Sequence, residues 1–302
     1  MTGHSGILIR SLITMALLLT LFWLGASRPA AAQGRGNESG RGGGGGGAGG
    51  GGATGWIEQF SDALIENRGW GIEQTGSPDS LFGVPGTGVS KSFDRNNISF
   101  LNGTIRLKLS LRNESGALTS RGALVYTRAL YSYGSYEWCA RMSSTAELPS
   151  GAGSLASGGI SAGFVYVNNS QTEIDFELAR SGSADWFLYM ANWANRRLTS
   201  SAEQATASPP NDFHAGFKIY KFVWARDYIE FFVNDRSLAF HTTNVPRNSA
   251  YVIMNHWGTN SPSAFGGPAD TSKPDRYFFV DWVRYTPQFG LPVGGTVSCG
   301  PA

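Results

Sequence analysis

The chain contains little cysteine, little charge and almost no helical periodicity. Only two of its 302 residues are cysteine, and only 15% are charged. Two cysteines cannot form a zinc framework, and a formal net charge of +2 excludes a strongly basic nucleic-acid-binding protein. Hydrophobic residues nevertheless make up 41% of the chain and aromatic residues 13%, which is too much for a disordered protein. The chain therefore contains a sizeable core that is built mainly without helices.

The first 32 residues have the pattern of an export signal. Arg10 precedes an apolar run, Leu12 to Leu24, which is shorter than the roughly 20 residues that span a bilayer. Ala30-Ala31-Ala32 supplies a small-residue cleavage pattern. We expect residues 1–32 to be a signal peptide and the protein to be secreted, either extracellular or periplasmic; an uncleaved anchor is the alternative. The remaining chain carries 22 basic and 22 acidic residues, so we expect no nucleic-acid partner and no membrane association after cleavage.

Glycine dominates the segment that follows, residues 33–55. Such a segment cannot bury enough surface to offset its backbone entropy, so we predict a disordered linker. Residues 56–287 then form a single domain, which we expect to be monomeric, and residues 288–302 form a C-terminal tail. Cys139 lies in the domain and Cys299 in the tail. The two cysteines either form a disulfide that ties the tail to the domain or remain a buried and a free thiol, and the sequence leaves both open.

Short runs of strand-forming residues, separated by turn residues, indicate an all-β domain. Only residues 56–66 have an ambiguous helical pattern. Many short strands with turn signals between them are typical of an antiparallel sandwich or barrel. Ten runs are predicted as strands: Thr104–Ser110, Ser135–Met142, Ile160–Val167, Thr172–Ala179, Trp186–Ala191, Phe217–Trp224, Tyr228–Val233, Leu238–His241, Tyr251–Trp257 and Tyr277–Tyr285.

One predicted strand carries three acids at alternate positions. Side chains alternate between the two faces of a strand, so Glu173, Asp175 and Glu177 share one face and the apolar residues between them share the other. Like charges so close together are unfavourable, and a purely structural strand has no reason to carry them. A retaining glycosidase does have a reason, because it needs one carboxyl as nucleophile and a second with a raised pKa as proton donor. A solvated acidic strand and a calcium site are the alternatives.

The sequence resembles glycoside hydrolase family 16 at several motifs in order along residues 90–286. The acidic strand, Glu173 to Glu177, is similar to the Glu-x-Asp-x-Glu signature of that family. Four further segments are similar to the family's other motifs: Tyr131–Glu137, Trp224–Asp235, Ile253–Trp257 and Val280–Tyr285.

This resemblance implies a β-jelly roll, a sandwich of two curved antiparallel sheets of the concanavalin A-like lectin and glucanase type, with the substrate cleft on the concave face. It also implies retaining double displacement, with Glu173 as nucleophile, Glu177 as acid/base and Asp175 as the assisting carboxylate. The short spacing of the signature favours an endo-acting hydrolase of β-1,3/1,4-type glucans, and a polysaccharide is the expected partner. A transglycosylase on the same glucans and a non-catalytic carbohydrate-binding module of the same fold are the alternatives.

Four further residues are candidates for sugar binding. Asn255 and Trp257 share strand parity, and Tyr189 and Trp193 lie on the strand after the acidic one. Aromatic faces stack on sugar rings and amides bind hydroxyls, although core packing explains the same residues. We expect no cofactor and no catalytic metal, with a structural calcium ion left open.

Overall fold

The computed structural model describes residues 54–167, 170–183, 185–195, 203–207, 213–288, 290 and 293–301. The predicted signal peptide and all but the last two residues of the predicted linker lie outside the described residues. Within these ranges, no helix is both long and apolar enough to cross a membrane.

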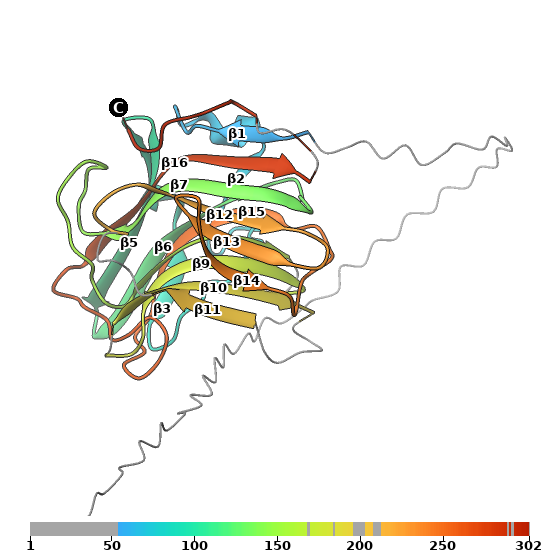
Figure 1. The fold of residues 1–302 in the computed structure, drawn as a ribbon. Helices are drawn as coiled ribbons and strands as arrows, with labels where there is room; N and C mark the ends of the chain where they lie inside the picture. The colour runs from blue at the N-terminus through green and yellow to red at the C-terminus, as the bar shows by residue number, and fades with distance from the viewer. Residues whose placement is uncertain are drawn as a thin grey trace, which may run out of the picture.

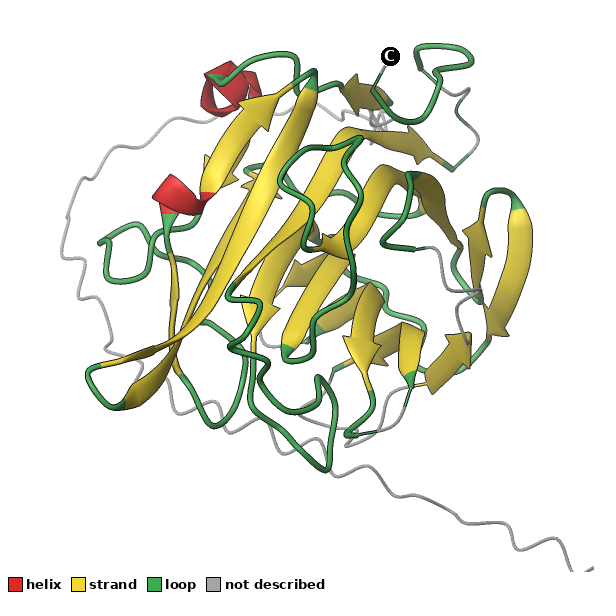
Figure 2. Cartoon of the chain, turned by 90° about the vertical axis from the view of Figure 1, so that its left-hand side faces the viewer, coloured by secondary structure: helices red, strands yellow, loops and turns green. Residues whose placement is uncertain are grey.

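The regular secondary structure of the described chain is almost entirely β-strand, with two short 3-10 helices (Figures 1 and 2). The helices are η1 (Leu64–Arg68) and η2 (Arg95–Asn97). The strands are β1 (Trp56–Glu58), β2 (Trp70–Ile72), β3 (Ser90–Phe93), β4 (Ile98–Leu101), β5 (Thr104–Glu114), β6 (Ala117–Thr127), β7 (Gly134–Ser144), β8 (Gly159–Val167), β9 (Thr172–Arg180), β10 (Trp186–Ala194), β11 (Glu203–Ala207), β12 (Lys218–Trp224), β13 (Ile229–Val233), β14 (Arg236–His241), β15 (Tyr251–Gly258) and β16 (Asp275–Pro287).

All ten predicted strands are confirmed, with small changes at their ends. Strand β6, the short strands β1 to β4 and β11 are additional. The ambiguous N-terminal segment is not one helix, because it contains strand β1 and then helix η1. The predicted all-β class is therefore correct.

The strands form two sheets that share strand β6, and the strand pairs of the described chain are antiparallel except for β3 with β6, which is parallel. One sheet has the order β11-β10-β9-β8-β15-β6, and the other continues from β6 as β5-β16-β7-β12-β13-β14. Residues 117–121 of β6 pair with β5, whereas residues 123–126 pair with β15. Gly122 lies between these halves, and a Cβ there would lie 2.2 Å from the carbonyl oxygen of His256. Only glycine therefore fits where the chain passes from one sheet to the other.

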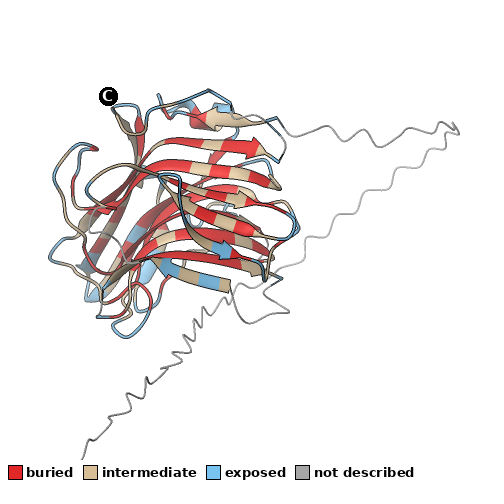
Figure 3. Ribbon diagram, in the orientation of Figure 1, coloured by how far each residue is buried: buried red, intermediate tan, exposed pale blue. Residues whose placement is uncertain are grey.

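The main core lies between the two sheets, and buried residues follow the strands (Figure 3). Trp138 of β7 is fully buried and packs against Gly163 of β8, where a Cβ would lie 3.1 Å from the indole ring. Tyr136 and Trp224 add further fully buried rings from the β7 and β12 side. The glycine in one sheet thus accommodates the large ring from the other, which brings the sheets together at native packing density.

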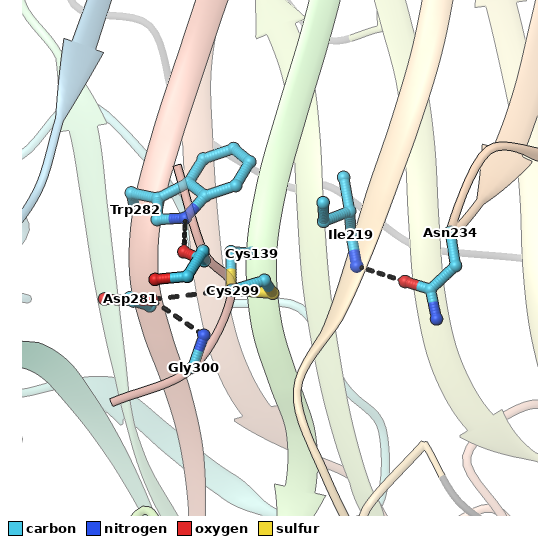
Figure 4. Close-up of a disulfide and its surroundings, with 8 residues drawn as sticks. Cys139, Ile219, Asn234, Asp281, Trp282, Cys299 and Gly300 are labelled. Atoms are coloured by element: carbon cyan, nitrogen blue, oxygen red, sulfur yellow. Dashed lines mark hydrogen bonds between the residues drawn. A yellow bond between two sulfur atoms is a disulfide. The ribbon is translucent and has the colours of Figure 1, made fainter. Parts of the chain in front are cut away.

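A disulfide joins the C-terminal tail to the second sheet (Figure 4). Cys139 of β7 and Cys299 are bonded, and their Cα atoms lie 5.5 Å apart. Beside this bond, the Gly300 amide donates to Asp281 at 2.8 Å, and the Trp282 indole donates to the Ser298 carbonyl at 2.9 Å. Of the two alternatives left by the sequence, the structure therefore contains the disulfide, reinforced by two hydrogen bonds from β16 and the tail.

The disulfide closes a loop of 160 residues, so breaking it should destabilise the domain. We expect Cys299→Ser to lower the free energy of unfolding by about 2–4 kcal/mol, because a long cross-link strongly restricts the unfolded chain. Thermal unfolding of the wild type with and without reductant, and of the variant, measures this effect. The variant serves as the control, since reductant should not change its Tm. An equal Tm for the oxidised and reduced wild type would contradict the expectation.

Candidate active site

The acidic residues lie on β9, and the packing of that strand sets their direction. Ile174, Phe176 and Leu178 are fully buried in the core between the sheets. The Phe176 ring contacts the Phe231 ring of the opposite sheet, with 5.2 Å between centroids. Because side chains alternate along a strand, the three carboxylates point to the opposite face, away from the core between the sheets. The sequence prediction that the strand has an apolar face and an acidic face is confirmed.

Burial and mutual repulsion change the proton affinity of these carboxyls. Asp175 is 4% exposed, and burial, together with the charges of Glu173 and Glu177, raises its pKa well above the ordinary value. Glu177 is half-buried. Burial, and then the charge of Glu173, raise the pKa of Glu177 from 4.5 to about 8. The site therefore holds carboxyls that stay protonated at pH values where an ordinary glutamate is ionised.

All four predicted sugar-binding residues lie on the same face as the carboxylates. Tyr189 of β10 is directly opposite Glu177, and Trp193 is directly opposite Glu173. Asn255 of β15 is in register with Ala162 of β8, which is itself opposite Glu177. Trp257 has the same parity as Asn255, two residues further along β15. Directly opposite residues in an antiparallel pair share a face, so the register places these residues around the acidic strand.

These four residues differ in how far neighbouring groups cover them. Trp193 is partly exposed, whereas Tyr189 is 5% and Trp257 is 6% exposed. Both of the latter rings contact Phe265, with centroid distances of 4.9 Å for Tyr189 and 6.1 Å for Trp257. Asn255 is 5% exposed, and in the described part of the chain its buried Oδ1 atom has no hydrogen-bond partner. An unpaired buried acceptor on this face is a group that a ligand hydroxyl would satisfy.

Further aromatic residues that the sequence analysis missed complete this face. Tyr166 is opposite Glu173, and Tyr251 is opposite Tyr166. Strand parity could have indicated both, because they alternate with core residues in predicted strands. Phe82 and Phe265 come from loops, and no pattern in the sequence places a loop residue over a sheet. Together with their neighbours, these residues form a second apolar cluster, separate from the main core.

No metal centre is evident in the part of the chain that the structure describes. Among those residues, no group of three or more His, Cys, Asp or Glu side chains is arranged to hold a metal ion. The expectation that the protein needs no cofactor stays a prediction. The question of a structural calcium ion stays open as well.

Comparison with known proteins places this arrangement in a family. The family model described as "Glycosyl hydrolases family 16" matches residues 86–284. A beta-glucanase from Acetivibrio thermocellus is 27% identical over 202 residues, which are 65% of this chain and 54% of that protein. The matched part covers 29% and 54% of the first two curated relatives, so the chain spans about half of their length or less.

Solved structures have the same fold at low sequence identity. The Bacillus licheniformis beta-glucanase is 19% identical, with a TM-score of 0.61, and the match covers 78% of this chain and 99% of that one. The laminarinase catalytic domain from Thermotoga maritima is 18% identical, also with a TM-score of 0.61, over 78% of this chain and 98% of that one. The fold is therefore the predicted β-jelly roll. Since the family model covers well over half of the chain, including the strand β9 that carries the carboxylates, the chain belongs to glycosyl hydrolases family 16.

Proposed function

We propose that this chain is an exported, endo-acting glycoside hydrolase that cleaves β-1,3/1,4-type glucans with retention of configuration. The observation that carries the proposal is the acidic face of β9, where Asp175 and Glu177 have raised pKa values beside Glu173. A binding module has no use for a proton donor, whereas glycoside hydrolysis requires one. Membership of family 16 and the beta-glucanase relatives support the substrate class.

In this proposal Glu173 is the nucleophile and Glu177 the acid/base. Glu173 attacks the anomeric carbon and forms an ester with the sugar, while Glu177 gives its proton to the departing glycosidic oxygen. Glu177 then takes a proton from water, which attacks the same carbon and releases Glu173. Two displacements restore the original configuration. The raised pKa of Glu177 supports its role, because an acid with a pKa of about 8 still holds its proton at neutral pH.

Asp175 assists both steps from its place between the two glutamates. Burial and both glutamate charges raise its pKa, which favours the protonated form, and a protonated carboxyl can donate a hydrogen bond to a neighbouring carboxylate. Such a bond would stabilise Glu173 when it leaves the sugar as an anion.

The apolar surroundings of the acids favour transglycosylation as the second candidate. Tyr166, Tyr189 and Phe265 line the carboxylate face, and all three belong to the same apolar cluster. A face of this kind would bind a second sugar in competition with water. That sugar, in place of water, would then accept the glycosyl group from Glu173. Product sizing on lichenan, laminarin, xyloglucan, cellulose and agarose distinguishes the two outcomes, because transfer yields products longer than the substrate.

The two glutamate variants should respond differently to an added small anion. We expect Glu173→Ala to abolish hydrolysis, and azide to restore turnover of an activated substrate with inverted configuration, because azide attacks directly from the vacated space. Glu177→Ala should still form the glycosyl–enzyme from substrates with good leaving groups, so azide should give a product of retained configuration. Asp175→Asn should remain folded and slow both steps. Product configuration is read by NMR.

Two results would contradict the roles proposed for Glu173 and Glu177. Near-normal hydrolysis by Glu173→Ala, or rescue of both glutamate variants with the same configuration, would overturn them. Tm values of the variants serve as the control for folding.

The activity should fall on the alkaline side as Glu177 loses its proton. Because burial and the charge of Glu173 raise its pKa to about 8, we expect kcat/KM to decline with an apparent pKa near that value. Initial rates measured from about pH 4 to pH 10, in buffers of constant ionic strength, provide the test. A decline centred near the ordinary glutamate value would show that the donor is not Glu177.

The same group should make the fold less stable as pH rises. The folded state keeps the Glu177 proton up to about pH 8, whereas the unfolded state loses it near 4.5, so stability present at low pH is lost across this interval. Glu177→Gln should flatten this slope and raise the Tm at pH 8 relative to the wild type. Asp227→Asn, at an exposed turn, is the control for a change of charge alone. Identical slopes for the wild type and Glu177→Gln would refute the expectation.

A further inference from the structure

The segment between β2 and β3, residues 73–89, lies over the carboxylate-bearing sheet, and we call it the rim loop. Phe82 and Val84 in its middle pack against the apolar cluster of that face. Further along, a Cβ at Gly86 would lie 2.4 Å from the carbonyl oxygen of Gly258, at the end of β15. The rim loop is therefore in close contact with the same sheet face as the acids.

A buried carboxylate fastens the first half of the rim loop. Glu73 is 1% exposed and accepts hydrogen bonds from the backbone amides of Leu81 at 3.1 Å and Phe82 at 3.3 Å, and from the Ser80 hydroxyl. Glu73 thus fixes the backbone on which the Phe82 side chain stands.

The second half of the rim loop is fastened to the loop that follows β15. The Asn260 amide donates to the Thr87 carbonyl at 2.8 Å, and the Thr87 amide donates to the Thr259 hydroxyl at 3.0 Å. The rim loop is therefore held at two places, and the backbone amide of Phe82 is part of the first.

Phe82 stands on three tyrosines that lead away from the acidic strand. Its ring centroid lies 5.0 Å from that of Tyr126, 5.8 Å from Tyr251 and 6.2 Å from Tyr166. These tyrosines come from β6, β15 and β8, three successive strands beside β9. At about 4.8 Å between strands, β6 lies roughly 14 Å from β9. Since Tyr166 is directly opposite Glu173, the aromatic group begins beside the proposed nucleophile and extends outward.

We propose that Phe82 contacts a glucosyl unit bound on the β6 side of the acids, and that Glu73 is the positioning residue that holds Phe82 there. This inference rests on the proposed function. An aromatic ring on a loop contributes to affinity only if the free protein already holds it in place, because ordering it on binding would cost entropy. The buried Glu73 carboxylate holds the Phe82 ring in place before the glucan binds. The Phe82 ring affects the binding of long glucans only, because a short glucan would not reach so far from the acids.

Chain-length dependence in the full-length enzyme tests this proposal. The experiment is to measure kcat and KM on a series of β-1,3/1,4-gluco-oligosaccharides of increasing length for the wild type and for Phe82→Ala, Glu73→Ala, Ser80→Ala and Glu73→Gln. Leu81→Ala is the matched control, because Leu81 lies on the same loop and is 57% exposed. Phe82→Ala and Glu73→Ala should raise KM for the long substrates on the order of tenfold, and should raise KM for short substrates much less. Ser80→Ala should have a smaller effect in the same direction.

The conservative variant separates positioning from general folding. A glutamine at position 73 still offers an oxygen to the two backbone amides and a donor to the Ser80 hydroxyl, so Glu73→Gln should restore the KM of the wild type. If Glu73→Ala does not fold, Phe82→Ala, Ser80→Ala and Glu73→Gln carry the test.

Two results would overturn the proposal. Unchanged KM for Phe82→Ala at every substrate length would do so, as would a change in Glu73→Ala that is the same for short and long substrates. The wild type distinguishes this failure from that of the proposed function. If it hydrolyses the glucans while the variants show no dependence on length, only this inference falls; if it hydrolyses none of them, the proposed function falls and takes this inference with it.

Discussion

The packing of the apolar face of β9 against the opposite sheet is the interaction on which the proposed site depends. Phe176 is fully buried and contacts Phe231 and Tyr220, which fixes the strand in register and orientation. Strand alternation then leaves the carboxylates no other direction than the opposite face. The repulsion among three close acids is thus offset by the burial of the three apolar residues between them.

The same constraint explains why the acids have unusual proton affinities. Burial is the larger cause, because it penalises the ionised form of Asp175 and Glu177 and so raises the pKa of both. The charge of Glu173 on the same strand face raises both pKa values further. Fold stability and the proton affinity of Glu177 are therefore coupled, because the burial that raises its pKa makes its ionised form costly in the folded state.

The periphery of the domain uses cross-links of a different kind. The C-terminal tail is held by the disulfide between Cys139 and Cys299, and the rim loop is held by the Glu73 carboxylate and by backbone hydrogen bonds at Thr87. Among the residues that the structure describes in these two segments, none belongs to a strand or a helix. Polar or covalent attachment to a sheet thus replaces the ladder of hydrogen bonds that holds a strand.

The sequence by itself determined the all-β class, ten of the strands and the acidic face of β9, because the period of two in apolar residues depends only on local geometry. It also predicted that Asn255 and Trp257 lie on the same side of one strand, β15. It did not indicate strand β6, whose two halves pair with different sheets around Gly122, nor which of the two cysteine states occurs. Phe82 and Phe265 reach the site from loops, and only the tertiary structure decides where loops lie, because long-range contacts and not local periodicity fix their path.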